Sequence, residues 1–335
     1  MKTFKLLGLS IVVLLIAAAC GPAATPVPAT QAPAPTQAPL PTQPPATVLV
    51  VVTATPEPAT ATPEETAAPT PVAQVPDGAA VQKGKLLICT DFPYPPQEFF
   101  DDNGNPQGLD VEIGTEIANR LGLKPESVNS VFDTIIAAVK GGKCDIIISA
   151  QNITADRQKS VSMIPYFQAG QSMVAAKGNP QNINAPMDLC GKSAAAESGT
   201  TEADYLQGTG DYKGNGLTQQ CTKAGQKPVE VVVTQKDTDA LQQLQAGKVA
   251  VYFADSPVAA YYTVQHPDQF QLVGQVIEPA VEGISVPCGQ DDCTKAPLTP
   301  LGEAIQTALK SMMSDGTYGK ILAKWNLSDS AVKPQ

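Results

Sequence analysis

The chain has 335 residues, of which 43% are hydrophobic, so it can bury a sizeable core in one large domain or two small ones. Its formal net charge is −10 and no Lys/Arg cluster follows the first residues, which argues against nucleic acid and anionic membrane surfaces as partners. His266 is the single histidine and no Cys/His metal pattern exists, so we expect neither a metal nor a cofactor.

The first 20 residues have the pattern of an export signal. Two lysines precede an apolar run at 6–19 that is too short for a transmembrane helix. Three alanines, Cys20 and a glycine follow, an arrangement that resembles a bacterial lipobox, although Ala17 stands where that motif usually has Leu. We therefore predict a lipoprotein signal peptide at 1–20 with a lipid on Cys20. Simple cleavage and secretion is the alternative.

Residues 21–80 are rich in Pro, Thr and Ala and form no core. Between residues 21 and 76 only three side chains are charged, those of Glu57, Glu64 and Glu65. Such a composition is typical of a disordered, extended segment. We interpret it as a tether that holds the folded part away from a membrane.

From residue 84 onward, short apolar runs alternate with helical patterns, as in parallel sheets covered by helices. The first set of predicted elements comprises a strand at 86–89, a hairpin tip at 101–105, helices at 111–121 and 132–139, and a strand at 145–149. Residues 124–125 are interpreted as the end of the first helix. The set forms a first α/β lobe.

The pattern restarts at residue 193 and predicts a second α/β lobe. Its elements are strands at 193–196, 229–233 and 249–253 and helices at 200–206 and 238–246. Extended segments at 171–176 and 281–286 would cross between the lobes, and helices at 301–313 and 318–325 would return to the first. We predict lobe 1 at 81–175 and 283–335 and lobe 2 at 176–282, with a ligand cleft at the strand ends.

Polar residues follow several predicted strands at this cleft, and they match a free amino acid. The guanidinium of Arg157 suits the ligand's carboxylate, and Thr200 and Thr201 at a helix start add N–H donors. Asp255 is placed to bind the ammonium group. Two plainer roles stand beside these: Arg157 as a solvated helix residue, and Asp255 as the N-cap of the helix at 256–264.

Aromatic and acidic residues complete the predicted cleft. Tyr94 and Phe132 would sandwich the ligand's side chain, and Asp91 would read its distal polar group. The acidic residues Asp110 and Glu112 fall in the first turn of a helix, where they favour its dipole. Glu98 is interpreted as structural.

Several short motifs, in this order, are similar to the family 3 extracellular solute-binding proteins that serve polar amino-acid ABC importers. The matching strings are Thr90-Asp91-x-x-Tyr94-x-Pro96-x-Glu98, Gly108-Leu109-Asp110-Val111-Glu112, Phe132-Asp133-x-Ile135-Ile136, Ile153-Thr154-x-x-Arg157, Gly199-Thr200-Thr201 and Ala254-Asp255-Ser256-Pro257. The resemblance covers about 84–327 and implies a two-lobed, type II periplasmic-binding-protein-like α/β fold with two hinge crossovers.

The resemblance also implies roles for individual residues. It assigns Arg157, Thr200 and Thr201 to the ligand's α-carboxylate, Asp255 to the α-ammonium, and Asp91, Tyr94 and Phe132 to the side chain. It further implies that Ser149, Ala150 and Asn152 line the cleft. This chain departs from the family pattern at Gln97 and at 150–152, so the identity of the ligand stays open.

Besides Cys20, the chain has six cysteines, an even number that permits disulfides in an exported protein. Cys190 and Cys221 flank one candidate loop, and Cys288 and Cys293 would close a short one. Cys89 and Cys144 lie beside strand-like runs and are interpreted as buried thiols. Spacing alone leaves the pairing open.

The sequence therefore predicts a membrane-anchored, extracytoplasmic solute-binding protein of an ABC importer. A monomer would close about two hinges on a free basic or polar amino acid and then dock on a membrane permease. We expect no enzyme activity. The alternative is a secreted dehydratase of the cyclohexadienyl type on the same fold, which turnover of prephenate or arogenate would reveal.

Overall fold

The computed structural model describes residues 71–333, which fold around one eight-stranded sheet. Its strands are β1 (Lys85–Thr90), β4 (Lys124–Asn129), β5 (Ile146–Ile147), β6 (Ser162–Ala176), β7 (Ser193–Glu197), β8 (Glu230–Thr234), β9 (Val251–Asp255) and β10 (Phe270–Val286). They lie in the order β4-β1-β5-β10-β6-β9-β7-β8. The predicted signal peptide, Cys20 and residues 21–70 of the predicted tether lie outside the described residues.

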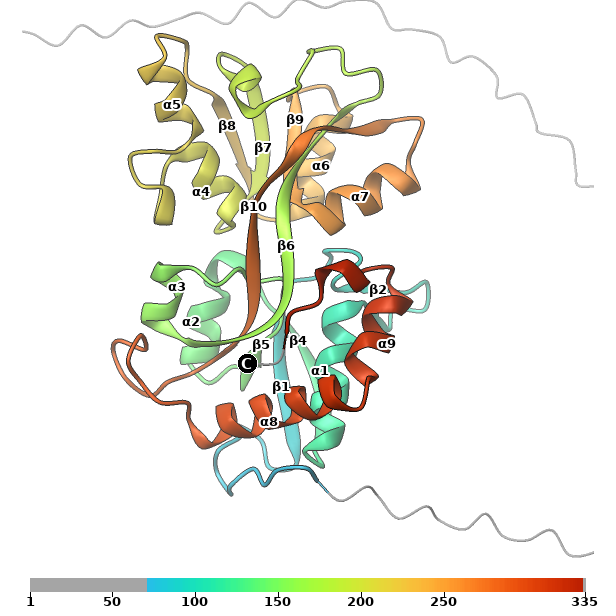
Figure 1. Ribbon diagram of the computed structural model, residues 1–335, viewed down its shortest axis with the longest axis vertical. Coiled ribbons are helices and arrows are strands. Elements are labelled where there is room, and N and C mark those ends of the chain that lie inside the picture. The colour runs from blue at the N-terminus through green and yellow to red at the C-terminus, as the bar shows by residue number, and fades with distance from the viewer. Residues whose placement is uncertain (1–70, 334–335) are drawn as a thin grey trace, which may run out of the picture. The chain divides into compact units, whose positions relative to one another are not determined.

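Two lobes flank the crossing strands β6 and β10 (Figure 1). Lobe 1 contains β1, β4 and β5, the hairpin of β2 (Phe99–Phe100) and β3 (Pro106–Gln107), and the helices α1 (Leu109–Arg120), α2 (Ile135–Lys140), α3 (Ala155–Ser160), α8 (Pro300–Ser314) and α9 (Thr317–Lys324). Lobe 2 contains β7, β8 and β9 with the helices α4 (Thr201–Gln207), α5 (Leu217–Lys223), α6 (Asp237–Gln245) and α7 (Ser256–Gln265).

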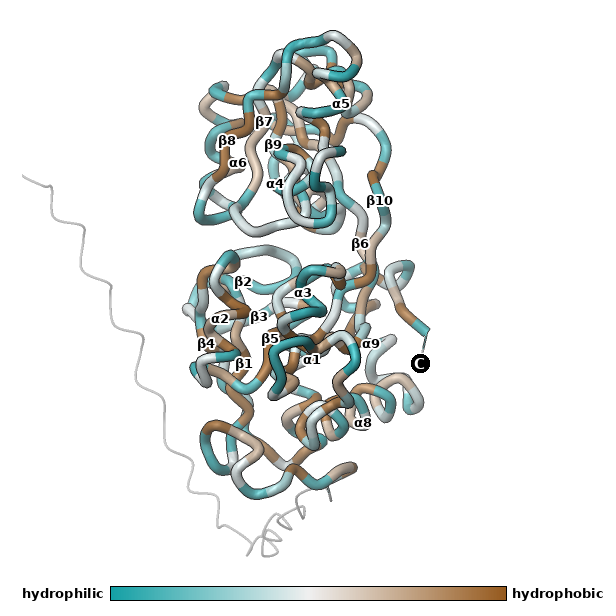
Figure 2. Tube along the Cα trace, turned by 90° about the vertical axis from the view of Figure 1, so that its left-hand side faces the viewer, coloured by the Kyte–Doolittle hydropathy of each residue, from teal (hydrophilic) through white to brown (hydrophobic). Residues whose placement is uncertain are grey.

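The crossing strands are longer than the sequence predicted. β6 and β10 pair antiparallel from Ser162 with Val286 to Ala176 with Phe270, and the register shifts at three places. Gly274 and Pro279 interrupt the apolar pattern of β10. For this reason the sequence predicted only the second half of the strand. Residues 274–276 are exposed, so little packing resists bending there. Figure 2 shows both strands running together from one lobe into the other.

Each lobe has hydrophobic clusters of its own. In lobe 1 the apolar residues of α1 recur at helical spacing, and Leu109, Ile113 and Ile117 are fully buried beneath α8 and α9. In lobe 2 the buried residues form clusters on both faces of the sheet. Tyr94 and Ala150 of lobe 1 pack into one of these lobe 2 clusters, so the lobes are in apolar contact.

Two strands of lobe 1 differ from the prediction for identifiable reasons. The residues interpreted as a helix end begin β4, which tolerates Pro125 because it lies at the edge of the sheet. The strand expected at 145–149 pairs only at Ile146–Ile147. Beyond it, Ala150 has a φ of 44°, a left-handed conformation that turns the chain toward the other lobe.

The structure contains three disulfides, Cys89–Cys144, Cys190–Cys221 and Cys288–Cys293. The interpretation of Cys89 and Cys144 as buried thiols is therefore wrong. β1 and β5 are adjacent parallel strands, and this pairing brings the end of one beside the start of the other. Cys89 and Cys144 are 55 residues apart in the sequence, and a separation of that length does not indicate that they meet in the fold.

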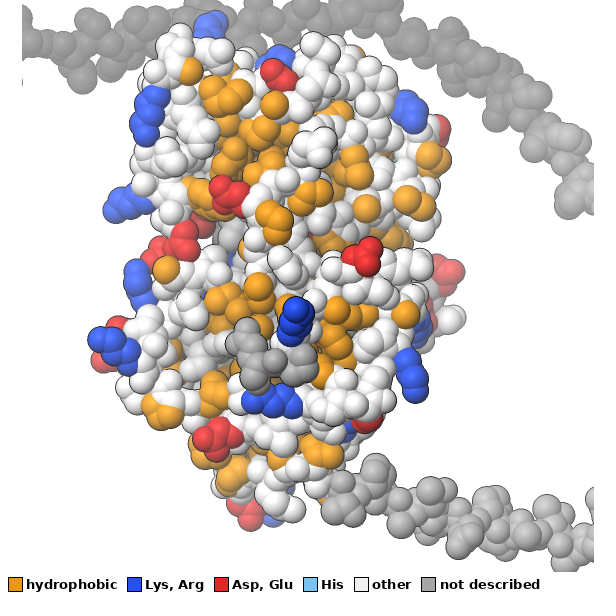
Figure 3. All heavy atoms as spheres, in the orientation of Figure 1, with side chains coloured by type: hydrophobic (Ala, Val, Ile, Leu, Met, Phe, Trp, Pro, Cys, Tyr) orange, Lys and Arg blue, Asp and Glu red, His pale blue; other side chains and the backbone are white. Residues whose placement is uncertain are grey.

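The described surface carries charges of both signs. Figure 3 shows acidic and basic side chains scattered over the visible face of both lobes, with neither sign gathered into a patch. No helix among residues 71–333 is both long and apolar enough to cross a membrane.

The disulfides should differ in their contribution to stability. Replacing Cys89 and Cys144 by alanine should lower the free energy of unfolding by about 4 kcal/mol, because that disulfide closes a long loop in the unfolded chain. The same replacement of Cys288 and Cys293, which are only 5 residues apart, should cost about 2 kcal/mol. Urea unfolding without reductant measures both, and equal losses would contradict this order.

Candidate ligand-binding site

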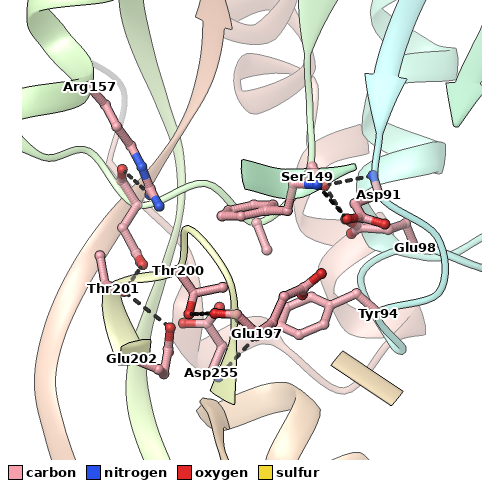
Figure 4. A pocket seen from close by; sticks show the side chains of 13 residues that line it. Asp91, Tyr94, Glu98, Ser149, Arg157, Glu197, Thr200, Thr201, Glu202 and Asp255 are labelled. Carbon is pink, nitrogen blue, oxygen red and sulfur yellow. Dashed lines mark hydrogen bonds between the residues drawn. The ribbon is translucent and has the colours of Figure 1, made fainter. Parts of the chain in front are cut away.

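All of the residues that the sequence assigned to ligand binding line one cavity between the lobes. The empty space between the lining atoms of this interlobe cavity, open solvent included, is about 300 Å³. The assigned residues are Asp91, Tyr94, Phe132, Ser149, Ala150, Asn152 and Arg157 from lobe 1 and Thr200, Thr201 and Asp255 from lobe 2. Three further lining residues, which the sequence analysis did not assign to the cavity, are Glu98, Glu197 and Glu202. In Figure 4 Arg157 lies at one end of the cavity, and Asp91 and Glu98 lie at the other.

Arg157 projects into the cavity from α3, whose N-cap Thr154 accepts the backbone N–H of Arg157 at 3.2 Å. Its guanidinium donates to the carbonyl oxygens of Asn152 at 2.8 Å and Gly199 at 2.9 Å, and it lies 5.3 Å from the centre of the Phe132 ring. The residue is only 9% exposed, so it is not a solvated helix residue. Burial lowers the pKa of Arg157, but a guanidinium stays charged in proteins.

The loop before α4 brings lobe 2 against lobe 1. Gly199 has a φ of +78°, and a Cβ atom there would lie 2.7 Å from the Cα of Asp133, so only glycine fits. The Thr200 hydroxyl caps α4 by accepting the N–H of Ala203 at 3.2 Å. The Thr201 hydroxyl donates to Asn152 Oδ1 at 2.7 Å, which links the lobes directly.

Asp255 is the last residue of β9, and its carboxyl points into the cavity beside Tyr94. The Tyr94 hydroxyl donates to Asp255 Oδ2 at 2.9 Å and accepts the Asp255 N–H at 3.1 Å. Asp255 stands at the N-cap position of α7, as the plainer interpretation expected, but its side chain makes no capping hydrogen bond to the helix. Oδ1 is buried and has no hydrogen-bond partner among residues 71–333. Burial, and then the nearby Glu202, raises the pKa of Asp255 well above its usual range.

Asp91 follows β1 and holds a partner that the sequence analysis missed. The ammonium of Lys236, from the loop before α6, forms an ion pair with Asp91 Oδ1 across the cleft. The Phe132 N–H donates to Oδ2 at 2.6 Å, and the Asp91 N–H donates to Ser149 Oγ at 2.9 Å. Lys236 lies in a polar loop, where lysines are usually solvated, so nothing in the sequence around it indicated that it pairs with Asp91.

Two acidic residues of lobe 1 have roles other than those first assigned. Glu98 is fully buried and lines the cavity, where its Oε1 accepts the Ser149 hydroxyl at 2.6 Å. Asp110 lies in the first turn of α1, as expected, but it is only 1% exposed. Its two oxygens accept the Ala150 N–H and the Tyr166 hydroxyl, each at 2.7 Å. It therefore anchors the cavity wall.

The cavity contains more buried acceptors than the protein itself satisfies. Glu197 at the end of β7 and Glu202 in α4 are both buried, and each has one carboxyl oxygen without a hydrogen-bond partner among the described residues. Burial, with the carboxyls of Asp237 and Asp91 nearby, raises the pKa of Glu197 to about 10. At neutral pH this carboxyl therefore keeps its proton.

The arrangement suits a ligand that brings a carboxylate to one end and N–H donors to the rest. Arg157 can bind an anion, and the unpaired oxygens of Asp255 and Glu197 can accept donors. Within residues 71–333, no three His, Cys, Asp or Glu side chains are grouped as a metal site would require.

Several known proteins are similar to this chain in sequence. The family model for bacterial extracellular solute-binding proteins, family 3, matches residues 86–328. The lysine/arginine/ornithine-binding periplasmic protein of Escherichia coli strain K12 is 30% identical over 247 residues, which cover 72% of this chain and 86% of that protein.

Solved structures agree in fold. An ancestral arginine-binding protein bound to arginine is 34% identical with a TM-score of 0.62, over 72% of this chain and 98% of that one. An ancestral amino acid-binding protein described as a precursor of cyclohexadienyl dehydratase is 29% identical with a TM-score of 0.60, over 72% and 95%. The predicted two-lobed fold and family are confirmed. The chain belongs to the bacterial extracellular solute-binding proteins of family 3.

Proposed function

We propose that the protein captures a free amino acid with a basic or polar side chain between its lobes and delivers it to an ABC importer. One observation carries the proposal: Arg157 of lobe 1 and Asp255 of lobe 2 line the same buried cavity. A guanidinium and a carboxylate so arranged match the two opposite charges that every free α-amino acid has. The arginine-binding neighbour and the E. coli relative support the same ligand class.

Each end of the ligand's backbone has a group to bind it. A guanidinium has five N–H donors, and the Asn152 and Gly199 carbonyls leave some of those on Arg157 for a carboxylate. The unpartnered Oδ1 of Asp255 is positioned for the ammonium, whose charge would favour loss of the proton from Asp255. Tyr94 holds the other oxygen, Oδ2, in place.

Binding and closure would be coupled through the crossing strands. An amino acid that first meets the Arg157 lobe would gain its ammonium partner only when β6 and β10 bend and bring Asp255 into position. Closure excludes water and so strengthens each charge-assisted hydrogen bond. A permease would then distinguish the closed, loaded protein from the open one.

The remaining predictions about location belong to this proposal. We infer that Cys20 carries a lipid and that the protein works as a monomer at the outer face of the membrane or in the periplasm. Of the tether predicted at 21–80, the part before residue 71 would act as the spacer, because Ala73, Val75 and Ala79 pack against the lobe 1 core. The description of the family as extracellular supports a location outside the cytoplasm.

A second candidate function, a dehydratase of the cyclohexadienyl type, is favoured by one observation. The protonated carboxyl of Glu197 in the cavity could give its proton to a leaving hydroxyl. We expect no turnover, because a pKa of about 10 makes this carboxyl a poor acid. Incubation with prephenate or arogenate, with the products separated by chromatography, tests this. Turnover that Glu197→Gln abolishes would favour the enzyme.

Replacing Arg157 tests the proposed function directly. A thermal-shift screen of the common amino acids would first identify the ligand, because a ligand of the native state raises the melting temperature. Arg157→Ala should then weaken the binding of that ligand by about 100-fold or more, because loss of one partner in a buried charge pair costs roughly 3 kcal/mol. Calorimetric titration measures the change.

Arg120, the other arginine of the sequence, provides a matched control for Arg157→Ala. Arg120 contacts Glu116 and Asp315 on the surface of lobe 1 and does not line the cavity. Arg120→Ala should lower the melting temperature and leave the dissociation constant unchanged. An Arg157→Ala variant that binds the ligand as tightly as the wild-type protein would contradict the proposal.

A further inference from the structure

The end of the interlobe cavity at Asp91 holds a cation that belongs to the protein itself. Lys236 reaches across from lobe 2, pairs with Asp91 Oδ1 and donates to the Phe92 carbonyl oxygen at 3.1 Å. The carboxylate does not need Lys236 to hold its position, because the Phe132 N–H donates to Oδ2. Lobe 1 therefore presents a fixed carboxylate, and the opposite lobe supplies its cation.

A second carboxyl lies beside the first. Glu197 is 6% exposed and within hydrogen-bonding reach of Asp91. Its Oε1 and the Oε2 of Glu98 are buried, line this cavity, and have no hydrogen-bond partner among residues 71–333. An unsatisfied buried acceptor destabilises the protein, so a ligand that brings several N–H donors is favoured here.

We propose that Asp91 and Glu197 form a carboxyl pair that binds the cationic side chain of a basic amino acid, and that Lys236 occupies this pair until the ligand's cation displaces it. The inference rests on the proposed amino-acid-binding function and narrows its ligand to positively charged side chains. Glu197 and Lys236 then determine specificity, the first as an additional acceptor and the second as an internal competitor.

The exposure of the ion pair indicates which partner can leave. The Lys236 side chain is 27% exposed, whereas that of Asp91 is 5% exposed. Lys236 sits just before α6 at the rim, so rotation of its long side chain returns the ammonium to water. Asp91 and Glu197 have no such route. Displacement by a ligand therefore moves the partly exposed Lys236 side chain and leaves the buried Asp91 and Glu197 in place.

The surroundings favour positive charge at this end. Two further carboxyls of the described residues lie near the pair, Glu98 from lobe 1 and Asp237 from lobe 2. Among the residues that line the cavity, Arg157 is the only cation, and it lies at the opposite end. A ligand with an anionic side chain would be repelled by these carboxyls.

Arginine and citrulline provide the test, because they share a shape and differ in one charge. Calorimetric titration of the purified protein with each gives an affinity ratio. In the wild-type protein arginine should bind more tightly. Lys236→Met should raise the ratio of arginine affinity to citrulline affinity by about fivefold, because it removes the ammonium that competes with the ligand's cation. Glu197→Gln should reduce the arginine preference by about tenfold, because it removes an ionisable acceptor.

Two exposed residues of lobe 2 serve as matched controls. Lys248→Met and Glu230→Gln make the same substitutions at positions that do not line the cavity, and they should leave the ratio unchanged. Thermal unfolding shows whether each variant is folded, and Glu197→Gln keeps the size of the side chain it replaces.

The outcomes separate this inference from the function on which it rests. Weaker arginine binding in Lys236→Met, or an unchanged ratio in Glu197→Gln, would overturn the inference alone. So would a wild-type protein that binds a neutral amino acid and not arginine. Failure of the wild-type protein to bind any amino acid would overturn the proposed function as well.

Discussion

Charge buried without a partner is the constraint that shapes this cavity. An unpaired carboxylate in a protein interior costs several kcal/mol, and carboxyls from both lobes converge on one small space. The protein meets the constraint in two ways: Glu197 keeps its proton, and Asp91 is paired with Lys236 from the opposite lobe. The proton on Glu197 and the ammonium of Lys236 each neutralise a carboxyl, and a positively charged ligand could take the place of either. A free basic amino acid would therefore fit a site that is short of donors.

The two crossing strands make this chemistry depend on conformation. Arg157 and Asp255 belong to different lobes, so they share a cavity only while β6 and β10 hold the lobes together. The contacts that span the cleft combine hydrogen bonds, such as Thr201 with Asn152 and Tyr94 with Asp255, with the packing of Tyr94 and Ala150 into a lobe 2 cluster. Each such hydrogen bond contributes modestly to stability on its own. The exposed centre of β10 is suited to the bending that opening and closure require.

The parts of the structure that could be predicted are those set by local pattern. Alternating apolar runs revealed two α/β lobes, and polar residues just after strands identified the cavity wall, including Arg157 and Asp255. Glu197 was missed because the alanine-rich run before it was interpreted as a strand ending one residue earlier. Lys236 was missed because only the tertiary fold brings its loop to Asp91. The same is true of the Cys89–Cys144 disulfide, which depends on strand pairing.

Ligand capture by this protein depends most on Arg157 and Asp255, which would hold opposite ends of one amino acid. A crystal structure of the protein with its bound amino acid measures this directly. We expect the ligand's carboxylate oxygens about 2.8 Å from the Arg157 guanidinium nitrogens and its ammonium nitrogen at a similar distance from Asp255. An amino acid bound outside the interlobe cavity, or one whose carboxylate and ammonium contact neither residue, would contradict this arrangement.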